Sequence, residues 1–262
     1  MSRLRIVIIG AGNVATHLAL ALRKKADIVQ IFGHTPERTR KLAEAVGDGV
    51  SYETDINQLA DADAYIVSIK DDAIAGFLNS VPARCRRSLW MHTSGSVGID
   101  VFEGFNDSHG ILYPLQTFSI DVDLNMEEVH FFCEGNHTDA ETGIQAVARL
   151  ISDHVHHADS DIRRQLHIAA VFACNFVNHM YTEASDILER NQLPFSAMLP
   201  LIKETTRKAV SYPAITPYEA QTGPAVRGDR NIIGKHLSML EGTEKEIYET
   251  VSNAILKRHN KA

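Results

Sequence analysis

A short apolar run near the start of the chain, LRIVIIG at residues 4–10, leads directly into the segment GAGNVA. Gly10 permits a tight turn after the predicted strand, and Gly12 lets the backbone approach a bound group closely. Ala15 keeps the following helix, predicted over residues 13–25, near the strand. The first turn of such a helix offers free N–H groups and a positive partial charge. A strand, this turn and a helix in that order predict a cradle for the pyrophosphate of a dinucleotide.

The rest of the first half continues the alternation of strands and helices. Further strands are predicted over residues 27–33, 61–70, 87–95 and 128–135, and helices over residues 36–47, 72–80 and 138–152. Alternation of this kind implies parallel β-α-β units in a doubly wound sheet. We therefore expect an α/β protein that begins with a doubly wound Rossmann domain over residues 1–157.

The second half is predicted to be all-helical. Residues 159–192 form one long helical pattern without Gly or Pro, and no strand is expected after about residue 157. Shorter helical patterns follow over residues 195–212, 228–240 and 243–259. We assign residues 158–262 to a C-terminal helical domain that contributes to substrate binding.

Charge and cysteine content exclude several classes of partner. The 26 Lys and Arg residues and 33 Asp and Glu residues give a formal net charge of −7, which argues against nucleic acid as the main partner. Cys85, Cys133 and Cys174 form no C-x-x-C pair, which is typical of a reducing, cytoplasmic location. No apolar run approaches the roughly 18 residues of a membrane span, and the N-terminal run is too short for a secretory leader.

The second predicted strand indicates which dinucleotide is bound. NAD-binding proteins carry an acid at its tip for the ribose 2′-OH, but here the strand leads into GHTPER without one. His34, Thr35 and Arg38 can instead hold a 2′-phosphate, as can Arg40, although both arginines are also explained as solvated helix charges. We predict NADP(H) as the cofactor. The predicted cofactor-binding residues are Gly10, Gly12, Asn13, Val14, Ala15, His34, Thr35, Arg38, Ser68, Ile69 and Lys70, the last three because they end the strand at the switch point of the sheet.

Two stretches between the nucleotide motif and the long helix are candidates for substrate binding. HTSGS at residues 92–96 places Ser94 and Ser96 at the end of a strand, although an ordinary hydrogen-bonded turn explains them as well. HGILYPLQTFS at residues 109–119 is interpreted as an irregular stretch in which His109, Tyr113 and Gln116 line the cleft, with His109 as a candidate substrate-binding residue.

One face of the long helix mixes polar groups into an apolar stretch. Val171, Cys174, Asn175 and Asn178 follow His167 at helical spacings. A buried polar group is costly unless it is paired or functional, and hydrogen bonds between helices in the core would also explain this stripe. As a catalytic pair, His167 would donate a proton, directly or through a bound water, and Asn175 would orient the substrate.

Two further motifs invite specific interpretations. DHVHHAD at residues 153–159 holds potential metal ligands, but their spacing fits no common zinc pattern, so no metal is predicted. QTGPAVRGD at residues 221–229 contains an Arg-Gly-Asp tripeptide, whose role in adhesion does not suit the expected cytoplasmic location. Gly223 and Pro224 are explained by a loop between helices, and we expect Arg227 to bring a guanidinium to an anionic substrate or the cofactor.

The motifs together carry a resemblance. GAGNVA, GHTPER and VSIKDDA resemble the NADP-binding domain of pyrroline-5-carboxylate reductase, ketopantoate reductase, the 3-hydroxyacid dehydrogenases and deazaflavin-dependent NADP oxidoreductases. HTSGS, YPLQTFS, HIAAVFACNFVNH and TGPAVRGD make the whole chain similar to bacterial Rossmann-like NADP oxidoreductases with a C-terminal helical domain. The chain lacks the lysine that the hydroxyacid dehydrogenases carry on the long helix.

The resemblance implies an NADPH-dependent oxidoreductase that dimerises through its helical domain. We expect it to reduce a small carbonyl or imine at a cleft between the domains. A non-catalytic NADP-binding redox sensor and an oxidoreductase acting between NADP and a deazaflavin coenzyme are the alternatives.

Overall fold

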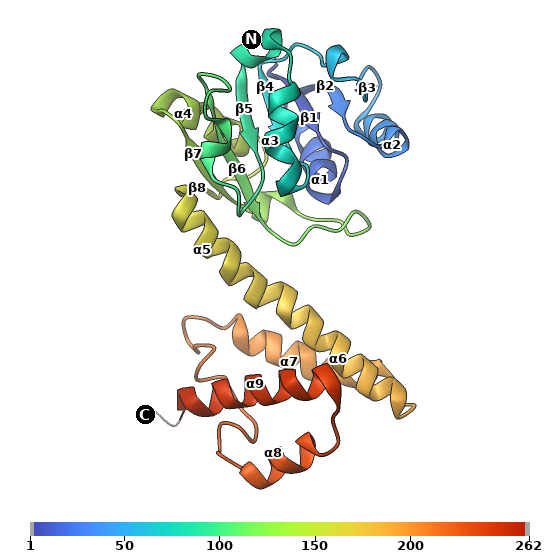
Figure 1. Ribbon diagram of the computed structural model, residues 1–262, viewed down its shortest axis with the longest axis vertical. Coiled ribbons are helices and arrows are strands. Elements are labelled where there is room, and N and C mark those ends of the chain that lie inside the picture. Colours follow the sequence, from blue (N-terminus) through green and yellow to red (C-terminus); the bar gives the residue numbers. More distant parts are fainter. Residues whose placement is uncertain (1–2, 260–262) are drawn as a thin grey trace. The chain divides into compact units, whose positions relative to one another are not determined.

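The computed structural model describes residues 3–259. The chain divides into two compact units, Met1–Asn175 and Phe176–Ala262, and the first contains an eight-stranded sheet (Figure 1). The strand order is β3-β2-β1-β4-β5-β6-β7-β8, with every neighbouring pair parallel except β6 and β7. The strands are β1 (Arg5–Ile9), β2 (Asp27–Phe32), β3 (Ser51–Glu53), β4 (Ala64–Val67), β5 (Leu89–His92), β6 (His109–Leu115), β7 (His130–Gly135) and β8 (Val155–His157).

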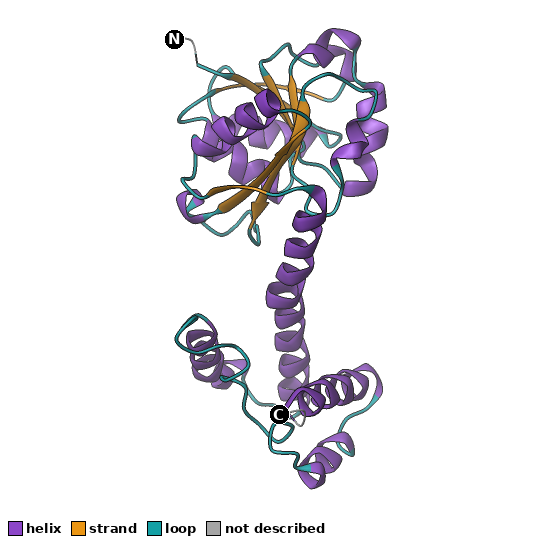
Figure 2. Ribbon diagram, turned by 90° about the vertical axis from the view of Figure 1, so that its left-hand side faces the viewer, coloured by secondary structure: helices purple, strands orange, loops and turns teal. Residues whose placement is uncertain are grey.

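Helices cover both faces of this sheet, as its buried strands require (Figure 2). In β1, Ile6 and Ile8 pack into one hydrophobic cluster and Val7 and Ile9 into the other, on opposite faces. The first cluster takes its helical residues from α1 (Asn13–Leu22), α2 (Pro36–Val46) and α4 (Thr138–Arg149), and the second from α3 (Asp71–Ser80). Short 3₁₀ helices occupy Ile56–Gln58, Ala83–Arg87, Ile99–Phe102 and Met126–Glu128. The predicted doubly wound Rossmann architecture is confirmed.

Three strands were not expected from the sequence. β3 and β8 are short edge strands of three residues each, too brief to show a pattern. The interpretation of residues 109–119 as irregular is wrong for its first part, because His109–Leu115 forms the interior strand β6. The polar residue His109 and the proline Pro114 are unusual in an interior strand, so the sequence did not predict one here, although the central residues of β6 are buried.

The first compact unit includes α5 (Ser160–Ala170), which the sequence assigned to the helical domain. The fully buried Arg163 fixes α5 to this unit through a hydrogen bond to the Val97 carbonyl and an ion pair with Glu134. A π-helical segment, Val171–Phe176, follows where the sequence predicted an uninterrupted α-helix. The division at residues 157/158 thus remains a prediction about domains, whereas the compact units meet at residues 175/176.

The second compact unit is helical, as predicted. It comprises α6 (Val177–Arg190), a 3₁₀ turn (Phe195–Met198), α7 (Leu199–Ala209), α8 (Arg230–Leu237) and α9 (Gly242–His259). Among its described residues, only Ala225 and Ser252 are buried. Large apolar side chains remain accessible, with Leu201 63%, Val210 72% and Met239 80% exposed. In the described part of the chain, no helix combines the length and apolar character needed to cross a membrane.

Candidate active site

The GAGNVA turn lies where the carboxyl ends of β1, β2 and β4 meet, at the switch point of the sheet. The Gly10 N–H donates to the Phe32 carbonyl (2.7 Å), and the Ser68 N–H donates to the Ile9 carbonyl (2.7 Å). A cavity of about 260 Å³ opens here. Its lining residues are Gly10, Ala11, Gly12, Gly33, His34, Thr35, Arg38, Thr39, Ser68, Ile69 and Lys70. It therefore collects most of the predicted cofactor-binding residues.

Gly10 and Gly12 have different structural roles in the turn. Gly10 has a φ of +115°, and a Cβ atom there would lie 2.0 Å from the Ser68 carbonyl oxygen, so no other residue fits. A Cβ at Gly12 would meet nothing within 4 Å, so open space lies against this backbone at the start of α1. That space, beside free helix N–H groups, fits the pyrophosphate of a dinucleotide.

The two arginines after β2 are in different situations. Arg40 is held by Glu44 (2.6 Å) and Glu37 (3.2 Å), so the simple explanation as helix charge applies to it. Arg38 is exposed, lines the cavity and has no ion pair with another residue of the described chain. Arg38 is thus the guanidinium available for a phosphate at the end of β2.

The remaining predicted cofactor residues have structural roles as well. Ala15 is fully buried on the inner face of α1, and Val14 lines the second cavity described below. The Asn13 side chain donates to the Phe118 carbonyl (2.8 Å), and His17 makes a hydrogen bond with the Ser119 carbonyl (3.0 Å). Both contacts tie the loop after β6 to the first turns of α1.

The second cavity, of about 270 Å³, lies entirely within the first compact unit. Its walls come from α1, the start of α3, the end of β6, the segments that follow β5 and β6, α5 and the π-helical segment. The lining residues are Val14, Asp71, Thr93, Ser94, Gly95, Ser96, Tyr113, Pro114, Leu115, Gln116, Thr117, Phe118, His167, Ala170, Val171, Cys174 and Asn175. Four predicted site residues, Ser94, Ser96, His167 and Asn175, are brought together here.

Tyr113, which the sequence predicted to line the cleft without a chemical role, faces His167. The Tyr113 hydroxyl and His167 Nδ1 are 3.1 Å apart, within hydrogen-bond distance. A Cβ atom on Gly95 would come within 2.7 Å of His167 Nδ1 and 2.8 Å of Tyr113 Cζ, so glycine makes room for the pair. Burial raises the pKa of Tyr113, and the charge of Arg163 opposes that shift. The pair provides two adjacent groups that can hold or move a proton.

A second polar group on the cavity wall links the segment after β5 to α3. Ser96 donates a hydrogen bond to the Asp71 carboxylate, and Ser94 Oγ lies 3.3 Å from Ser96 Oγ. Ser94 Oγ also accepts from the backbone N–H groups of Ser96 (3.1 Å) and Val97 (3.0 Å). The alternative of a hydrogen-bonded turn is therefore partly right, and both hydroxyls still line the cavity.

Behind the cavity lies a buried ion pair. The Arg163 guanidinium donates to Glu134 Oε2 (2.6 Å), and the same carboxylate oxygen accepts from the Ser160 hydroxyl (2.7 Å). Burial lowers the pKa of Arg163, and its partner Glu134 counteracts this shift. Because Arg163 precedes His167 by one helical turn, this ion pair sets the position of His167.

His92, at the end of β5, is fully buried beside this ion pair and stacks on Phe102, with ring centroids 5.6 Å apart. Desolvation and the charge of Arg163 lower its pKa from 6.5 to about 4.

We expect His92 to make the protein less stable as the pH falls from about 6.5 towards 4. In that window the unfolded chain binds a proton at position 92 and the folded protein does not, so acid favours unfolding. The loss should reach about 3 kcal/mol below pH 4. Denaturant unfolding across this pH range should show a shallower slope for His92→Phe than for the wild type. Equal slopes would contradict the assignment.

Two predicted substrate residues are not brought to this cavity. His109 lies outside its lining, where its Nδ1 makes a hydrogen bond with the Asn106 carbonyl (3.0 Å) and its ring stacks on Phe102 at 5.0 Å. The structure thus gives His109 a packing role, because it begins a strand instead of lying in an irregular loop. Arg227 is an exposed residue of the second compact unit.

Two histidines of DHVHHAD, His154 and His156, contact His130 of β7. His130 and His156 are joined by a hydrogen bond of 2.9 Å, and His130 stacks on His154 at 4.6 Å. Among the residues that the structure describes, no group of three or more His, Cys, Asp or Glu is arranged to hold a metal ion.

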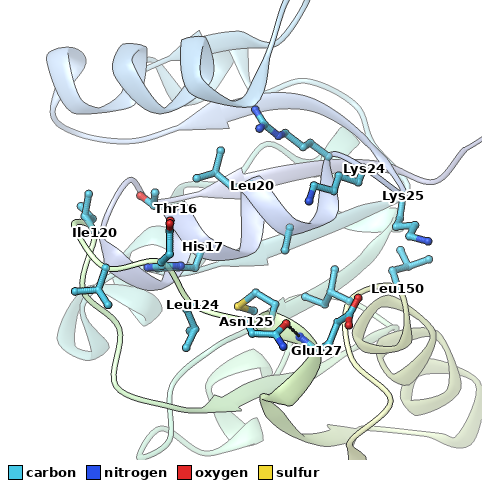
Figure 3. Close-up of a pocket in the computed structure, with 16 residues that line it drawn as sticks. Thr16, His17, Leu20, Lys24, Lys25, Ile120, Leu124, Asn125, Glu127 and Leu150 are labelled. Carbon is cyan, nitrogen blue, oxygen red and sulfur yellow. Dashed lines mark hydrogen bonds between the residues drawn. The ribbon is translucent and has the colours of Figure 1, made fainter.

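Another cavity, of about 370 Å³, lies between α1 and the loop before β7 (Figure 3). Its walls carry Lys24 and Lys25 from the end of α1 and Glu127 from the loop (Figure 3). None of the predicted site residues lines it. Because this larger cavity holds none of the predicted site residues and lies apart from the Tyr113–His167 pair, the cavity around His167 is the candidate active site.

Two family models match different parts of the chain, and the second match begins at residue 129, within the first compact unit. A family described as NADP oxidoreductase, coenzyme F420-dependent, matches residues 5–89, which include the GAGNVA turn and Arg38. A family described as a domain of unknown function (DUF2520) matches residues 129–255, which include His167 and Arg227. No curated protein matches the chain.

Similar solved structures cover nearly the whole chain. A Bacteroides fragilis protein provisionally named an NADP oxidoreductase is 43% identical, with a TM-score of 0.90, over 97% of this chain and 98% of that chain. An imine reductase from Myxococcus stipitatus in complex with NADP⁺ is 16% identical, with a TM-score of 0.70, over 98% and 93% of the two chains. A 1-pyrroline-5-carboxylate reductase from Streptococcus pyogenes is 14% identical, with a TM-score of 0.63, over 97% and 98%. The last two likenesses show the shared fold.

Proposed function

Since the chain belongs to the family of NADP oxidoreductases that join an F420-dependent-type nucleotide domain to a DUF2520 domain, we propose that it reduces a small carbonyl or imine with NADPH. The observation that carries the proposal is the Tyr113–His167 pair in a cavity that shares a wall with the nucleotide cradle. That shared wall is α1, which begins after Gly12 in the cradle and contributes Val14 to the cavity. A non-catalytic NADP sensor needs no such proton donor, so the pair favours an enzyme.

The chemistry divides between the cofactor and the chain. Bound NADPH supplies a hydride to the carbon of a C=O or C=N group. His167 then donates the proton that the oxygen or nitrogen requires, and Tyr113 holds its Nδ1 so that Nε2 remains for the substrate. In this proposal Asn175 orients the substrate, and Ser94 and Ser96 contact its polar group. These residues line one cavity, which supports their joint assignment.

In the same proposal, different residues of the cradle bind different parts of the cofactor. The backbone at Gly10, Gly12 and Asn13 faces the pyrophosphate, while Ser68, Ile69 and Lys70 form the wall beside the nicotinamide ribose. His34, Thr35 and Arg38 hold the 2′-phosphate.

We expect Arg38→Ala to raise the Kd for NADPH by about 10–100-fold, because a charge-assisted hydrogen bond to the 2′-phosphate is lost. The Kd for NADH, which has no such phosphate, should stay unchanged. Titrations followed by nicotinamide fluorescence measure both constants. Arg40→Ala is the matched control, because Arg40 is already paired with Glu37 and Glu44. Tighter binding of NADH than of NADPH by the wild type would refute the phosphate pocket.

The second compact unit supports a homodimer through the C-terminal helices. A helical unit with only Ala225 and Ser252 buried among its described residues has too small a core of its own. An apolar cavity of about 340 Å³, with Met180, Ile187 and Val251 in its wall, adds to the surface that a second copy would cover. Light scattering should give the mass of a dimer, and a monomeric mass at micromolar concentration would contradict the proposal.

The free thiols of Cys85, Cys133 and Cys174 support a reducing location, which we propose is the cytoplasm. Cys85 and Cys133 are buried, and burial raises the pKa of both thiols.

A further inference from the structure

The hydrogen bonds of Ser94, Ser96 and Asp71 have a fixed direction. A carboxylate only accepts hydrogen bonds, so the Ser96 hydroxyl is the donor to Asp71. Ser96 Oγ must then accept from Ser94, whose own oxygen already accepts from two backbone N–H groups. The Ser94 hydroxyl proton therefore points to Ser96 Oγ, and the Ser96 hydroxyl proton points to the Asp71 carboxylate.

This direction determines what the cavity wall offers to a substrate. With both hydroxyl protons engaged, the wall presents acceptors, namely a lone pair of Ser96 Oγ and the second oxygen of Asp71. Among the described residues, Asp71 Oδ1 accepts no hydrogen bond. A carbonyl oxygen is itself an acceptor and finds no donor on this wall. An N–H group finds a partner.

The charges around the cavity point the same way. Asp71 is the one carboxylate among the described lining residues, and the lining contains no Lys or Arg. Most of the other walls are apolar or uncharged, with Val14, Leu115 and Phe118 among them. A carboxylate that faces such a cavity attracts a cation and repels an anion.

The position of Asp71 in the first turn of α3 has a simpler explanation, which is stabilisation of the helix dipole. Asp72 stands in the same first turn and does not line the cavity. Asp72 alone can therefore stabilise the helix dipole. Asp71 is distinguished by its hydrogen bond from Ser96, which places its carboxylate on the cavity wall.

We infer that the substrate of this site is a cationic C=N compound, a protonated imine with apolar substituents, whose N–H⁺ binds Asp71 and Ser96. The inference rests on the reductase function proposed above and narrows its substrate class. The hydride adds to the carbon of the protonated imine, the C=N π electron pair moves to nitrogen as a lone pair, and the resulting amine takes its second proton from His167 and leaves as an ammonium ion. Substrates with a carboxylate beside the C=N group are disfavoured by Asp71.

Ligand binding tests this inference without turnover. Pyrrolidine, a cation at neutral pH, and cyclopentanol, a neutral ring of similar size, are titrated by calorimetry into the protein saturated with NADP⁺. We expect pyrrolidine to bind about tenfold more tightly than cyclopentanol, and Asp71→Asn to weaken pyrrolidine by about fivefold to tenfold. Asp72→Asn, the matched control, should leave both constants unchanged. Equal binding of the two rings, no binding of pyrrolidine, or an unaffected Asp71→Asn variant each overturns the inference.

Turnover separates this inference from the proposed function. NADPH oxidation is measured with 2-methyl-1-pyrroline and with cyclopentanone. Faster oxidation with the imine, reduced in Asp71→Asn and retained in Asp72→Asn, supports both proposals. Equal or faster oxidation with the ketone overturns the cationic substrate and leaves the reductase standing. Pyrrolidine binding that depends on Asp71, without oxidation by any carbonyl or imine, supports the cation site and counts against the reductase.

Discussion

Replacing His167 with alanine is expected to lower kcat by about 10²–10⁴-fold, the usual contribution of a positioned general acid. The affinity for NADPH should stay within about twofold, because His167 lines the substrate cavity and not the nucleotide cradle. The physical reason is the loss of the ring that makes a hydrogen bond with the Tyr113 hydroxyl and donates to the substrate. Steady-state rates with 2-methyl-1-pyrroline and a fluorescence titration of NADPH measure the two effects.

Two variants serve as controls for His167→Ala. His179→Ala removes a histidine that pairs with Glu183 at 3.3 Å on α6 and should leave kcat unchanged. Tyr113→Phe keeps the ring but loses the hydroxyl, so a smaller loss, about tenfold, is expected from one missing hydrogen bond. Wild-type kcat in His167→Ala would remove this residue from the mechanism and leave a bound water as the donor.

The second large effect concerns stability. Arg163→Met is expected to lower the free energy of unfolding by about 3–5 kcal/mol, the usual cost of breaking a buried ion pair from one side. The Arg163 side chain is 0% exposed and that of Glu134 is 12% exposed, so the carboxylate would be left buried without its partner. Urea unfolding monitored by circular dichroism measures the change.

A double variant separates the ion pair from simple packing. Arg163→Met combined with Glu134→Gln should recover part of the lost stability, because no charge is left unpaired. Arg164→Met is the matched control, since Arg164 is exposed and pairs with Asp161 at the surface. If Arg163→Met and Arg164→Met change stability equally, the buried pair does not hold α5 as described.

Much of the nucleotide half could be predicted from the sequence. The strand before Gly10 is a continuous apolar run buried on both faces, and the glycine turn that follows has few other uses. The Rossmann fold, the family resemblance and NADP as cofactor are confirmed. These features depend on local sequence, which is why they can be read without the tertiary structure.

The cavity around His167 was only partly predictable, because its members converge from distant segments. The sequence placed Tyr113 in the cleft without a chemical role, because Pro114 and the polar ends of its segment obscured the strand β6. The same misinterpretation made His109 a substrate-binding candidate, although His109 lies outside the cavity lining. The continuous apolar run GILYP at residues 110–114 could have indicated a strand, since strands buried on both faces have such runs. Arg163 and Glu134 lie far apart in sequence, and no local sequence pattern indicates that they form an ion pair.

The central claim is that this chain transfers hydride from NADPH to a substrate held beside His167. The most direct test is to supply NADPH with both hydrogens at nicotinamide C4 replaced by deuterium, together with 2-methyl-1-pyrroline, and to analyse the product amine by mass spectrometry. The account predicts one deuterium on the carbon that was double-bonded to nitrogen, formed by the wild type and largely lost in His167→Ala. Tight NADPH binding without deuterium in any product, over a panel of imines and carbonyls, would contradict it.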